Sequence, residues 1–307
     1  MASSKVAILT GAASGMGEAL ARDLISKGWI VACLDVQKTA GEALVAELGP
    51  NALFILCDIA DYDQQAKAFS TVWNTYGRID ALLANAGIVD RSSIYILDHR
   101  DKDEYWSPSA TTIPPKPDTL CTDIDYKAVV YGVQLAIHFM RKNPNPGGMI
   151  IATASIAAIH PHPTYPEYCG AKAAVSSPTN FIGHSTYSQK VVNFALCMEP
   201  MLKQRENISI NLVLPGIVPT KIVPQEMIDA VSPEHRTPTS TIVAAYNYFL
   251  DNPTVTGQLV ECSADKHFFL PRPELANGTV TKRAVTVWEP LFEKLHSERS
   301  GLSDAIA

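Results

Sequence analysis

The chain of 307 residues is 47% hydrophobic and 18% charged, so it can bury a large core and is not expected to be disordered. Its 25 basic and 31 acidic residues leave a net charge of −6, and no basic run could neutralise a phosphate backbone, which argues against nucleic acid as a partner. No signal-peptide pattern and no uninterrupted apolar run of about 18 residues is found, so we expect a cytoplasmic protein without a membrane partner.

The predicted elements alternate along the first half of the chain. Nearly continuous apolar runs, typical of strands buried on both faces, cover residues 6–10, 29–35, 52–58, 81–87 and 148–155. Between them, residues 15–28, 39–49 and 61–77 have apolar side chains at helical spacing, and each segment ends at a glycine. Further strand signals follow at 207–216 and 256–265. This order predicts an α/β fold, a Rossmann-type doubly wound parallel sheet with helices on both faces.

No linker divides the chain, so we expect a single Rossmann-type domain over residues 1–265. The proline-rich stretch at about 218–240 is predicted to be a substrate lid or loop rather than core. Residues 266–307 are predicted to form a C-terminal extension, in which the amphipathic segment TVWEPLFEKLHSE packs back on the domain.

A glycine-rich turn follows the first predicted strand directly. The segment TGAASGMG places Gly11, Gly15 and Gly17 directly after that strand, where they open the next helix. Glycines let a backbone turn sharply and approach a pyrophosphate, and the helix N-terminus supplies free N–H groups and a partial positive charge. The strand, turn and helix together are the context that a dinucleotide cradle requires.

Asp35 ends the second predicted strand, eighteen residues after Gly17. A carboxylate there can accept hydrogen bonds from both hydroxyls of an adenosine ribose, and it would repel a 2′-phosphate. No arginine stands beside Asp35, so the predicted cofactor is NAD rather than NADP. The plainer alternative is an aspartate that only caps the turn after a strand.

Two later strand ends are predicted to border the same cleft, because ligands in open parallel sheets lie at the carboxyl ends of the strands. Asp58 and Ile59 are placed where an adenine ring could lie, and Asn85, Ala86 and Gly87 are placed beneath the cofactor.

Five motifs, in this order, resemble the short-chain dehydrogenase/reductase superfamily: TGxxxGxG at 10–17, NAG at 85–87, Ser155 thirteen residues before Tyr168, YxxxK at 168–172 and PGIVPT at 215–220. The similarity spans about residues 5–265, and LAIHFMRKNP is similar to fungal members related to 15-hydroxyprostaglandin dehydrogenases. The resemblance implies a homodimer or homotetramer that acts on a small hydrophobic alcohol or ketone. It also implies cofactor contacts from Gly11, Ser14, Gly15, Met16, Gly17, Asp35, Asp58, Ile59, Asn85, Ala86, Gly87, Tyr168, Lys172, Pro215, Gly216, Val218 and Thr220.

The stretch PHPTYPEYCGAK carries the groups that could move a proton. A phenol, with an ordinary pKa of about 10, is a poor base at neutral pH unless a nearby cation favours its ionised form. Tyr168 and Lys172 are four residues apart and so share one face of a helix. Tyr165 precedes Pro166, and proline is typical of a first helical turn, so we expect Tyr165 outside the helix, lining the site or packing.

Ser155 ends a predicted strand and can donate a hydrogen bond to a substrate oxygen. The family resemblance implies that Ser155 orients the substrate, that Tyr168 is the catalytic acid/base, and that Lys172 binds the nicotinamide ribose and lowers the phenol pKa. Asp125 stands where the family has an asparagine in a proton relay. Because a carboxylate can still hold water and could strengthen the charge of Lys172, we expect activity to survive this departure.

Other titratable groups near this stretch are predicted to pack. His160 and His162 have no carboxylate or cysteine partner at ligand spacing, so no metal site is expected. The side chain of Cys169 should point away from the face that carries Tyr168 and Lys172. The six cysteines are scattered without a CxxC pair, which indicates reduced thiols.

Two segments are longer than the family pattern. The loop at about 89–122 could be a substrate lid, an oligomer contact or simple loop drift. Residues 176–190 interrupt what would otherwise be one continuous amphipathic helix, and they include Pro178 and Gly183. We hypothesise a translated intron or a gene-model error there. A genuine insertion would instead bulge from the helix that forms part of the dimer interface in this family.

The function predicted from these residues is NAD(H)-dependent hydride transfer that interconverts a hydrophobic secondary alcohol and its ketone. Two alternatives remain from other classes. One is a catalytically silent dinucleotide-binding regulator, and the other is an interaction module that uses the loop at 89–122.

Overall fold

The computed structural model describes residues 4–175, 194–272 and 274–307. The hypothesis on residues 176–190 therefore concerns a segment outside the described residues. One sheet of eight strands, in the order β3-β2-β1-β4-β5-β6-β7-β8, forms the centre of the molecule. Its strands are β1 Val6–Thr10, β2 Ile30–Asp35, β3 Ala52–Leu56, β4 Ala81–Ala84, β5 Gly148–Thr153, β6 Ile208–Pro215, β7 Leu259–Ser263 and β8 Lys266–Leu270.

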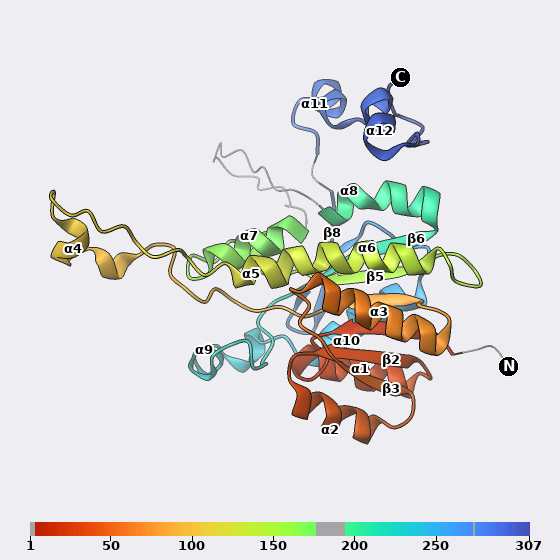
Figure 1. Cartoon of the computed structure of the whole chain (residues 1–307), viewed down its shortest axis with the longest axis horizontal. Coiled ribbons are helices and arrows are strands. Elements are labelled where there is room, and N and C mark those ends of the chain that lie inside the picture. Colours follow the sequence, from red (N-terminus) through yellow and green to blue (C-terminus); the bar gives the residue numbers. More distant parts are fainter. Residues whose placement is uncertain (1–3, 176–193, 273) are drawn as a thin grey trace.

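Helices cover both faces of the sheet (Figure 1). The α-helices are α1 Gly15–Ser26, α2 Lys38–Leu48, α3 Tyr62–Tyr76, α4 Asp103–Trp106, α5 Leu120–Thr122, α6 Ala128–Met140, α7 Pro166–Val175, α8 Phe194–Met201, α9 Gln225–Ala230, α10 Thr239–Asp251, α11 Gly278–Val285 and α12 Glu289–His296. Three 3-10 turns, η1 Leu97–His99, η3 Ile156–Ala158 and η5 Pro233–His235, and two π-helical turns, η2 Asp123–Lys127 and η4 Leu202–Glu206, complete the described elements.

The alternating side chains of each central strand enter two separate cores. In β1, Val6 and Ile8 pack with α3 and α6, whereas Ala7 and Leu9 pack with α1 and α10 on the opposite face. This alternation follows from the two-residue period of a strand, and the burial of both faces explains why β1 has no polar residue before Thr10. The expected doubly wound architecture is confirmed.

The strand order reverses between β1 and β4, and this reversal places the ligand cleft. The chain winds outward from β1 to β2 and β3 and then crosses back to β4 on the other side of β1. Crossovers on either side of such a point leave a crevice outside the carboxyl ends of the strands. Helix α1 follows β1 directly; Gly11 lies in the turn between them, and Gly15 and Gly17 lie in the first turn of α1.

Two expectations for the sheet were wrong. Strand β3 is not buried on both faces, because it is an edge strand, and Leu56 at its end is 55% exposed. An apolar run by itself does not distinguish an edge strand from a central one. Strand β8 was missed. It pairs antiparallel with β7 and so continues the sheet beyond residue 265.

The described residues that follow β8 lie outside the sheet. Figure 1 shows α11 and α12 apart from the sheet and nearest to α8. Arg205 of η4 forms an ion pair with Glu298, and Gln204 donates a hydrogen bond to the carbonyl of Gly301. Within the extension, a parallel bridge joins Trp288 and Ile306. This ion pair and this hydrogen bond join the extension to η4, which directly follows α8.

Among the described residues, no helix is both long enough and apolar enough to cross a membrane.

Candidate active site

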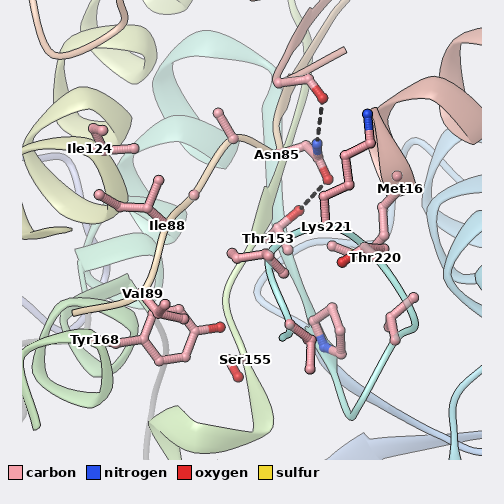
Figure 2. A pocket seen from close by; sticks show the side chains of 18 of the residues that line it. Met16, Asn85, Ile88, Val89, Ile124, Thr153, Ser155, Tyr168, Thr220 and Lys221 are labelled. Atoms are coloured by element: carbon pink, nitrogen blue, oxygen red, sulfur yellow. Dashed lines mark hydrogen bonds between the residues drawn. The ribbon is translucent and has the colours of Figure 1, made fainter. Parts of the chain in front are cut away.

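A cleft opens at the carboxyl ends of β1, β2, β4, β5 and β6, and Figure 2 shows the side chains that line it. The structure brings seventeen of the predicted site residues together in it: Gly11, Ser14, Gly15, Met16, Asp35, Asp58, Ile59, Asn85, Ala86, Gly87, Ser155, Tyr168, Lys172, Pro215, Gly216, Val218 and Thr220. Gly17 and Asp125 do not line it. Both lie behind residues that line the cleft: Gly17 packs against Gly11, and Asp125 packs against Gly87 and Lys172.

The glycine-rich turn has no room for side chains. Gly11 has a φ of +66°, and a Cβ there would lie 2.8 Å from the Cα of Ala86. A Cβ on Gly17 would lie 1.9 Å from the carbonyl oxygen of Gly11, so this glycine lets α1 pack against the turn rather than touching a ligand. The bare backbone at the start of α1 fits a dinucleotide pyrophosphate, which needs close approach to N–H groups.

Asp35 is held by the same turn. Its Oδ2 accepts a hydrogen bond from the backbone N–H of Ala13 at 2.9 Å, and its Oδ1 accepts one from the N–H of Gln37 at 2.9 Å. The side chain is only 7% exposed, yet it borders the cleft. Because each carboxylate oxygen has two lone pairs, both can still accept a ribose hydroxyl. The bond to Ala13 joins the end of β2 to the glycine-rich turn.

Asn85 fastens β4 to its neighbours beneath the cleft. Its side-chain amide donates to the carbonyl of Thr10 at 3.1 Å, and its Oδ1 accepts from the hydroxyl of Thr153 at 3.3 Å (Figure 2). The hydroxyl of Thr153 also lies 2.5 Å from that of Tyr246 in α10. Sequence reasoning missed Thr153 and Tyr246, because neither belongs to a motif.

Ser155 is fixed at the end of β5 as the cap of the short turn η3. Its Oγ accepts a hydrogen bond from the backbone N–H of Ala157 at 3.1 Å. That contact uses an acceptor lone pair and leaves the hydroxyl hydrogen to be donated, as the predicted role requires. Both Ser155 and Tyr168 line the cleft (Figure 2).

Helix α7 places Tyr168 and Lys172 one turn apart. Burial raises the pKa of Tyr168, while the Lys172 ammonium and the Ser155 hydroxyl act in the opposite direction. The Lys172 Nζ lies 5.7 Å from the centre of the Tyr168 ring. The same Nζ donates a hydrogen bond to the carbonyl of Thr153 at 3.0 Å, which anchors it on β5.

Asp125 forms a buried ion pair with Lys172. Its Oδ2 lies 2.9 Å from the Lys172 Nζ, and the two side chains are 0% and 3% exposed. Its Oδ1 accepts a hydrogen bond from the N–H of Ile88 at 2.8 Å. Burial acts to lower the pKa of Lys172, but Asp125 and Tyr168 outweigh it, so the pKa is raised and the ammonium form is stabilised.

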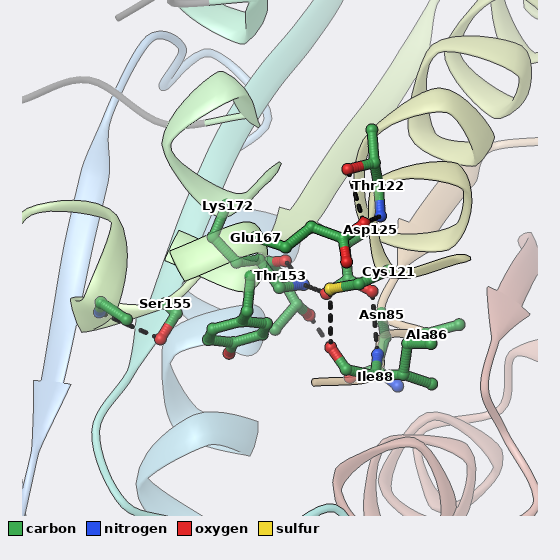
Figure 3. A network of polar contacts seen from close by, with 12 residues as sticks. Asn85, Ala86, Ile88, Cys121, Thr122, Asp125, Thr153, Ser155, Glu167 and Lys172 are labelled. Atoms are coloured by element: carbon green, nitrogen blue, oxygen red, sulfur yellow. Dashed lines mark hydrogen bonds and ion pairs between the residues drawn. The ribbon is translucent and has the colours of Figure 1, made fainter. Parts of the chain in front are cut away.

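Asp125 and Lys172 pack so closely against Gly87, in the loop after β4, that no side chain would fit at this position. A Cβ on Gly87 would lie 2.8 Å from Asp125 Oδ2 and 3.0 Å from Lys172 Nζ. Asp125 belongs to the π-helical turn η2, a local widening of the helix that is often found at functional sites. Figure 3 shows the pair within a larger network that includes Cys121, Thr122 and Glu167.

The remaining candidates lie as follows. Tyr165 directly precedes α7 and lines the cleft, as does His162, whose ring lies 5.5 Å from that of Tyr165. Cys169 is buried outside the cleft, and its Sγ accepts a hydrogen bond from the N–H of His162 at 3.1 Å. Sequence reasoning missed Asp90, Thr122 and Glu167, which join the loop at 89–122 to α7.

Comparison with known proteins gives a consistent result. The chain matches the short chain dehydrogenase family over residues 5–201. It is 51% identical to the short-chain dehydrogenase/reductase prx6 of Penicillium rubens, in an alignment that covers 98% of this chain and 97% of that one. It is 29% identical to the NAD(+) 15-hydroxyprostaglandin dehydrogenase of Homo sapiens, over 71% of this chain and 70% of the relative.

Solved structures show the same fold. The 3-ketoacyl-(acyl-carrier-protein) reductase from Brucella melitensis, complexed with NADH, has a TM-score of 0.68 at 19% identity, covering 84% of this chain and 96% of that one. A short-chain type dehydrogenase/reductase from Mycobacterium marinum has a TM-score of 0.68 at 24% identity, covering 86% and 95%. The family match over residues 5–201 and the 51% identity with the fungal relative show that the chain belongs to the short-chain dehydrogenase/reductase superfamily.

Proposed function

We propose that the protein is an NAD(H)-dependent oxidoreductase that interconverts a hydrophobic secondary alcohol and its ketone, with Tyr168 as the acid/base. The observation that carries this proposal is the arrangement of Ser155, Tyr168 and Lys172 in one cleft with the glycine-rich turn. A proton donor and a hydride site must lie close together for the two transfers to be coupled, and this cleft provides for both.

Each side chain has a task in the proposed reaction. When bound, the nicotinamide supplies or accepts the hydride. Ser155 donates a hydrogen bond that holds the substrate oxygen. In alcohol oxidation Tyr168 takes the proton from that oxygen, and in ketone reduction it returns one. Lys172 favours the phenolate, which is the base in oxidation and the form left after ketone reduction, because the Lys172 ammonium is kept charged by Asp125.

The cofactor preference rests on Asp35. Its carboxylate is fixed at the ribose end of the cleft by the N–H groups of Ala13 and Gln37. A 2′-phosphate would meet this negative charge, whereas two ribose hydroxyls would find acceptors. The NAD(+) in the name of the human relative and the NADH bound to the Brucella reductase agree with this preference.

The substrate end of the cleft is apolar, which supports a hydrophobic substrate. The chain supplies it from the loop after β4, from η3 and from the segment after β6: Ile88, Val89, Ile156, Ala157, Ile217, Ile222, Val223 and Met227. The segment Val218–Thr220 and the residues that follow it line one side, in agreement with the proposed lid at about 218–240. Burial of such a surface favours ligands with extended apolar parts.

A spectrophotometric screen tests the proposal. Secondary alcohols and ketones are assayed by the absorbance of NADH and NADPH, with NAD and NADP in parallel and with Tyr168→Phe as the control. We expect turnover that is faster with NAD and lost in the control. Binding of NADH without turnover on any substrate would favour the silent regulator instead, and faster turnover with NADP would overturn the argument from Asp35.

We also propose a homodimer or homotetramer and a cytoplasmic location, as expected for the family. Light scattering after size exclusion measures the first, and fractionation of cells that express the protein measures the second.

A further inference from the structure

The first turn of the catalytic helix is capped from a distant part of the chain. Pro166, the first residue of α7, has no N–H, so the next two residues supply the first donors that need a partner. The carboxylate of Asp90 accepts both bonds: Oδ2 from the N–H of Glu167 at 3.0 Å, and Oδ1 from the N–H of Tyr168 at 2.7 Å. The capping side chain thus comes from the start of the loop at 89–122.

The end of the same loop is bound to the same turn. The Glu167 side chain is 9% exposed, and its Oε1 accepts a hydrogen bond from the N–H of Thr122 at 2.7 Å and from its hydroxyl at 2.8 Å (Figure 3). Thr122 directly precedes η2, the turn that carries Asp125. The helix of Lys172 and the helix of Asp125 are therefore joined twice, once by the buried ion pair and once by Glu167.

The two arms of the loop are also joined to each other. The N–H of Asp118 donates to the hydroxyl of Ser92 at 3.1 Å, and the Asp118 carboxylate lies 3.7 Å from Arg91. The hydroxyl of Tyr95 donates to the carbonyl of Pro163, three residues before α7, at 3.0 Å. The base of the loop is thus closed and fastened to the segment that leads into α7, while its tip with α4 projects away from the sheet (Figure 1).

We propose that Asp90 is a positioning residue for Tyr168. Through Asp90 and through the Glu167–Thr122 pair, the loop at 89–122 sets the position of the Tyr168 phenol relative to the Ser155 hydroxyl. This inference rests on the proposed function, because it concerns the same tyrosine. Its physical basis is that Asp90 holds the backbone N–H of Tyr168 itself, so a displaced cap displaces the phenol. A shift of about 1 Å in a reacting group can cost about a hundredfold in rate.

The test compares Asp90→Ala with Asp90→Asn and with a matched control, Asp61→Ala. Asp61 caps α3 in the same way, since its Oδ1 accepts from the N–H groups of Asp63 and Gln64 at 2.9 and 3.2 Å. Each variant is measured for kcat at saturating NAD, for the Kd of NADH by fluorescence and for Tm.

We expect Asp90→Ala to lower kcat about tenfold with an unchanged Kd for NADH. Asp90→Asn, which keeps one acceptor oxygen but no charge, should lie between Asp90→Ala and the wild type. If the lost charge rather than the lost bonds were responsible, the two variants would behave alike, and the positioning role would be wrong. Asp90→Ala and Asp61→Ala should each lower Tm by a few degrees, but Asp61→Ala should leave kcat unchanged.

An unchanged kcat in Asp90→Ala, with the same fall in Tm as in the control, would show that the cap is only structural. Should Asp90→Ala not fold, Thr122→Val tests the second connection. It removes one of the two bonds to Glu167, and a kcat equal to wild type would count against the proposal.

Absence of turnover in the wild type would refute the proposed function instead. Hydrogen exchange at the Tyr168 amide then still decides whether the loop holds the helix: faster exchange in Asp90→Ala than in Asp61→Ala supports the connection, and equal exchange contradicts it.

Discussion

The two ends of the cleft, the proposed dinucleotide end with the glycine-rich turn and the proposed catalytic end with Tyr168, are built in different ways. At the dinucleotide end, the turn before α1 presents backbone groups, and Asp35 bonds to Ala13 only 22 residues earlier. At the catalytic end, side chains bridge long separations: Asp125 reaches Ile88 across 37 residues and Asp90 reaches Tyr168 across 78. The conformation of the turn depends on residues close together in the sequence, whereas the contacts at the catalytic end depend on how distant parts of the chain pack.

This difference predicts how each end responds to mutation. Loss of a group at the dinucleotide end should weaken one ligand contact, because the backbone cradle remains. Loss of a buried group at the catalytic end should disturb several elements at once, because Asp125, Lys172 and Asp90 each have two partners.

The largest effect is expected at the catalytic end, for Tyr168→Phe. Removal of the phenol hydroxyl removes the group that exchanges a proton with the substrate, so kcat should fall by about a thousandfold. NADH should still bind, because the glycine-rich turn and Asp35 are intact, and fluorescence titration checks this. Turnover within a few-fold of wild type would exclude Tyr168 as the acid/base.

The next largest effect is expected for Asp125→Asn. It leaves the buried Lys172 without its carboxylate partner, and breaking a buried pair in this way costs about 3 kcal/mol of unfolding free energy. Chemical denaturation measures it. Asp123→Asn is the control, since Asp123 pairs with Lys127 on the exposed side of the same turn and should contribute less than about 1 kcal/mol. Equal losses in the two variants would contradict the comparison between buried and exposed pairs.

The same variant has a defined pH dependence. The folded-state pKa of Lys172 is raised, so its contribution to stability is fully present below the ordinary lysine value of 10.5 and is lost as pH rises through the raised value. The gap in Tm between wild type and Asp125→Asn should therefore be largest near neutral pH and shrink above about 10.5. A gap that stays constant into the alkaline range would show that the lost interaction is not ionic.

A smaller effect is expected at the dinucleotide end, for Asp35→Asn. The change removes the charge and one acceptor from the ribose contact, which should raise KM for NAD about tenfold and narrow the preference over NADP. The value of kcat at saturating NAD should not change, because the catalytic end is untouched. An unaltered ratio of kcat/KM for the two cofactors would show that Asp35 only caps the turn.

The smallest effect is expected for Gly170→Ala on the exposed side of α7. A Cβ there meets nothing within 4 Å, so the better helix propensity of alanine should raise the unfolding free energy by at most about 1 kcal/mol. Gly41→Ala in α2 is the matched control, because its Cβ would lie 2.0 Å from the ring of Phe54 and should destabilise the protein. Thermal unfolding of both variants gives the comparison, and a loss of stability at Gly170 would contradict it.

The sequence predicted for a physical reason that the glycine-rich turn and Asp35 lie together in one cleft, while their contacts with a cofactor stay a prediction. Strand periodicity, the glycines and Asp35 act within about one βαβ unit, and the structure places them where the pattern required. Strand β8 gave no such signal. The turn before it places Ala264 at a φ of +49°, without the glycine or asparagine that usually marks a hairpin.

By itself, the sequence determined the alternation of strands and helices, the cradle at Gly11 and the helical face shared by Tyr168 and Lys172, since each depends on neighbours within a few residues. Only the tertiary structure decided that β3 lies at an edge, that Asp125 is buried against Lys172, and that Asp90 caps α7. Each of these features depends on parts of the chain that are far apart in sequence, and no local pattern encodes it, because it exists only once the sheet has brought its strand ends together.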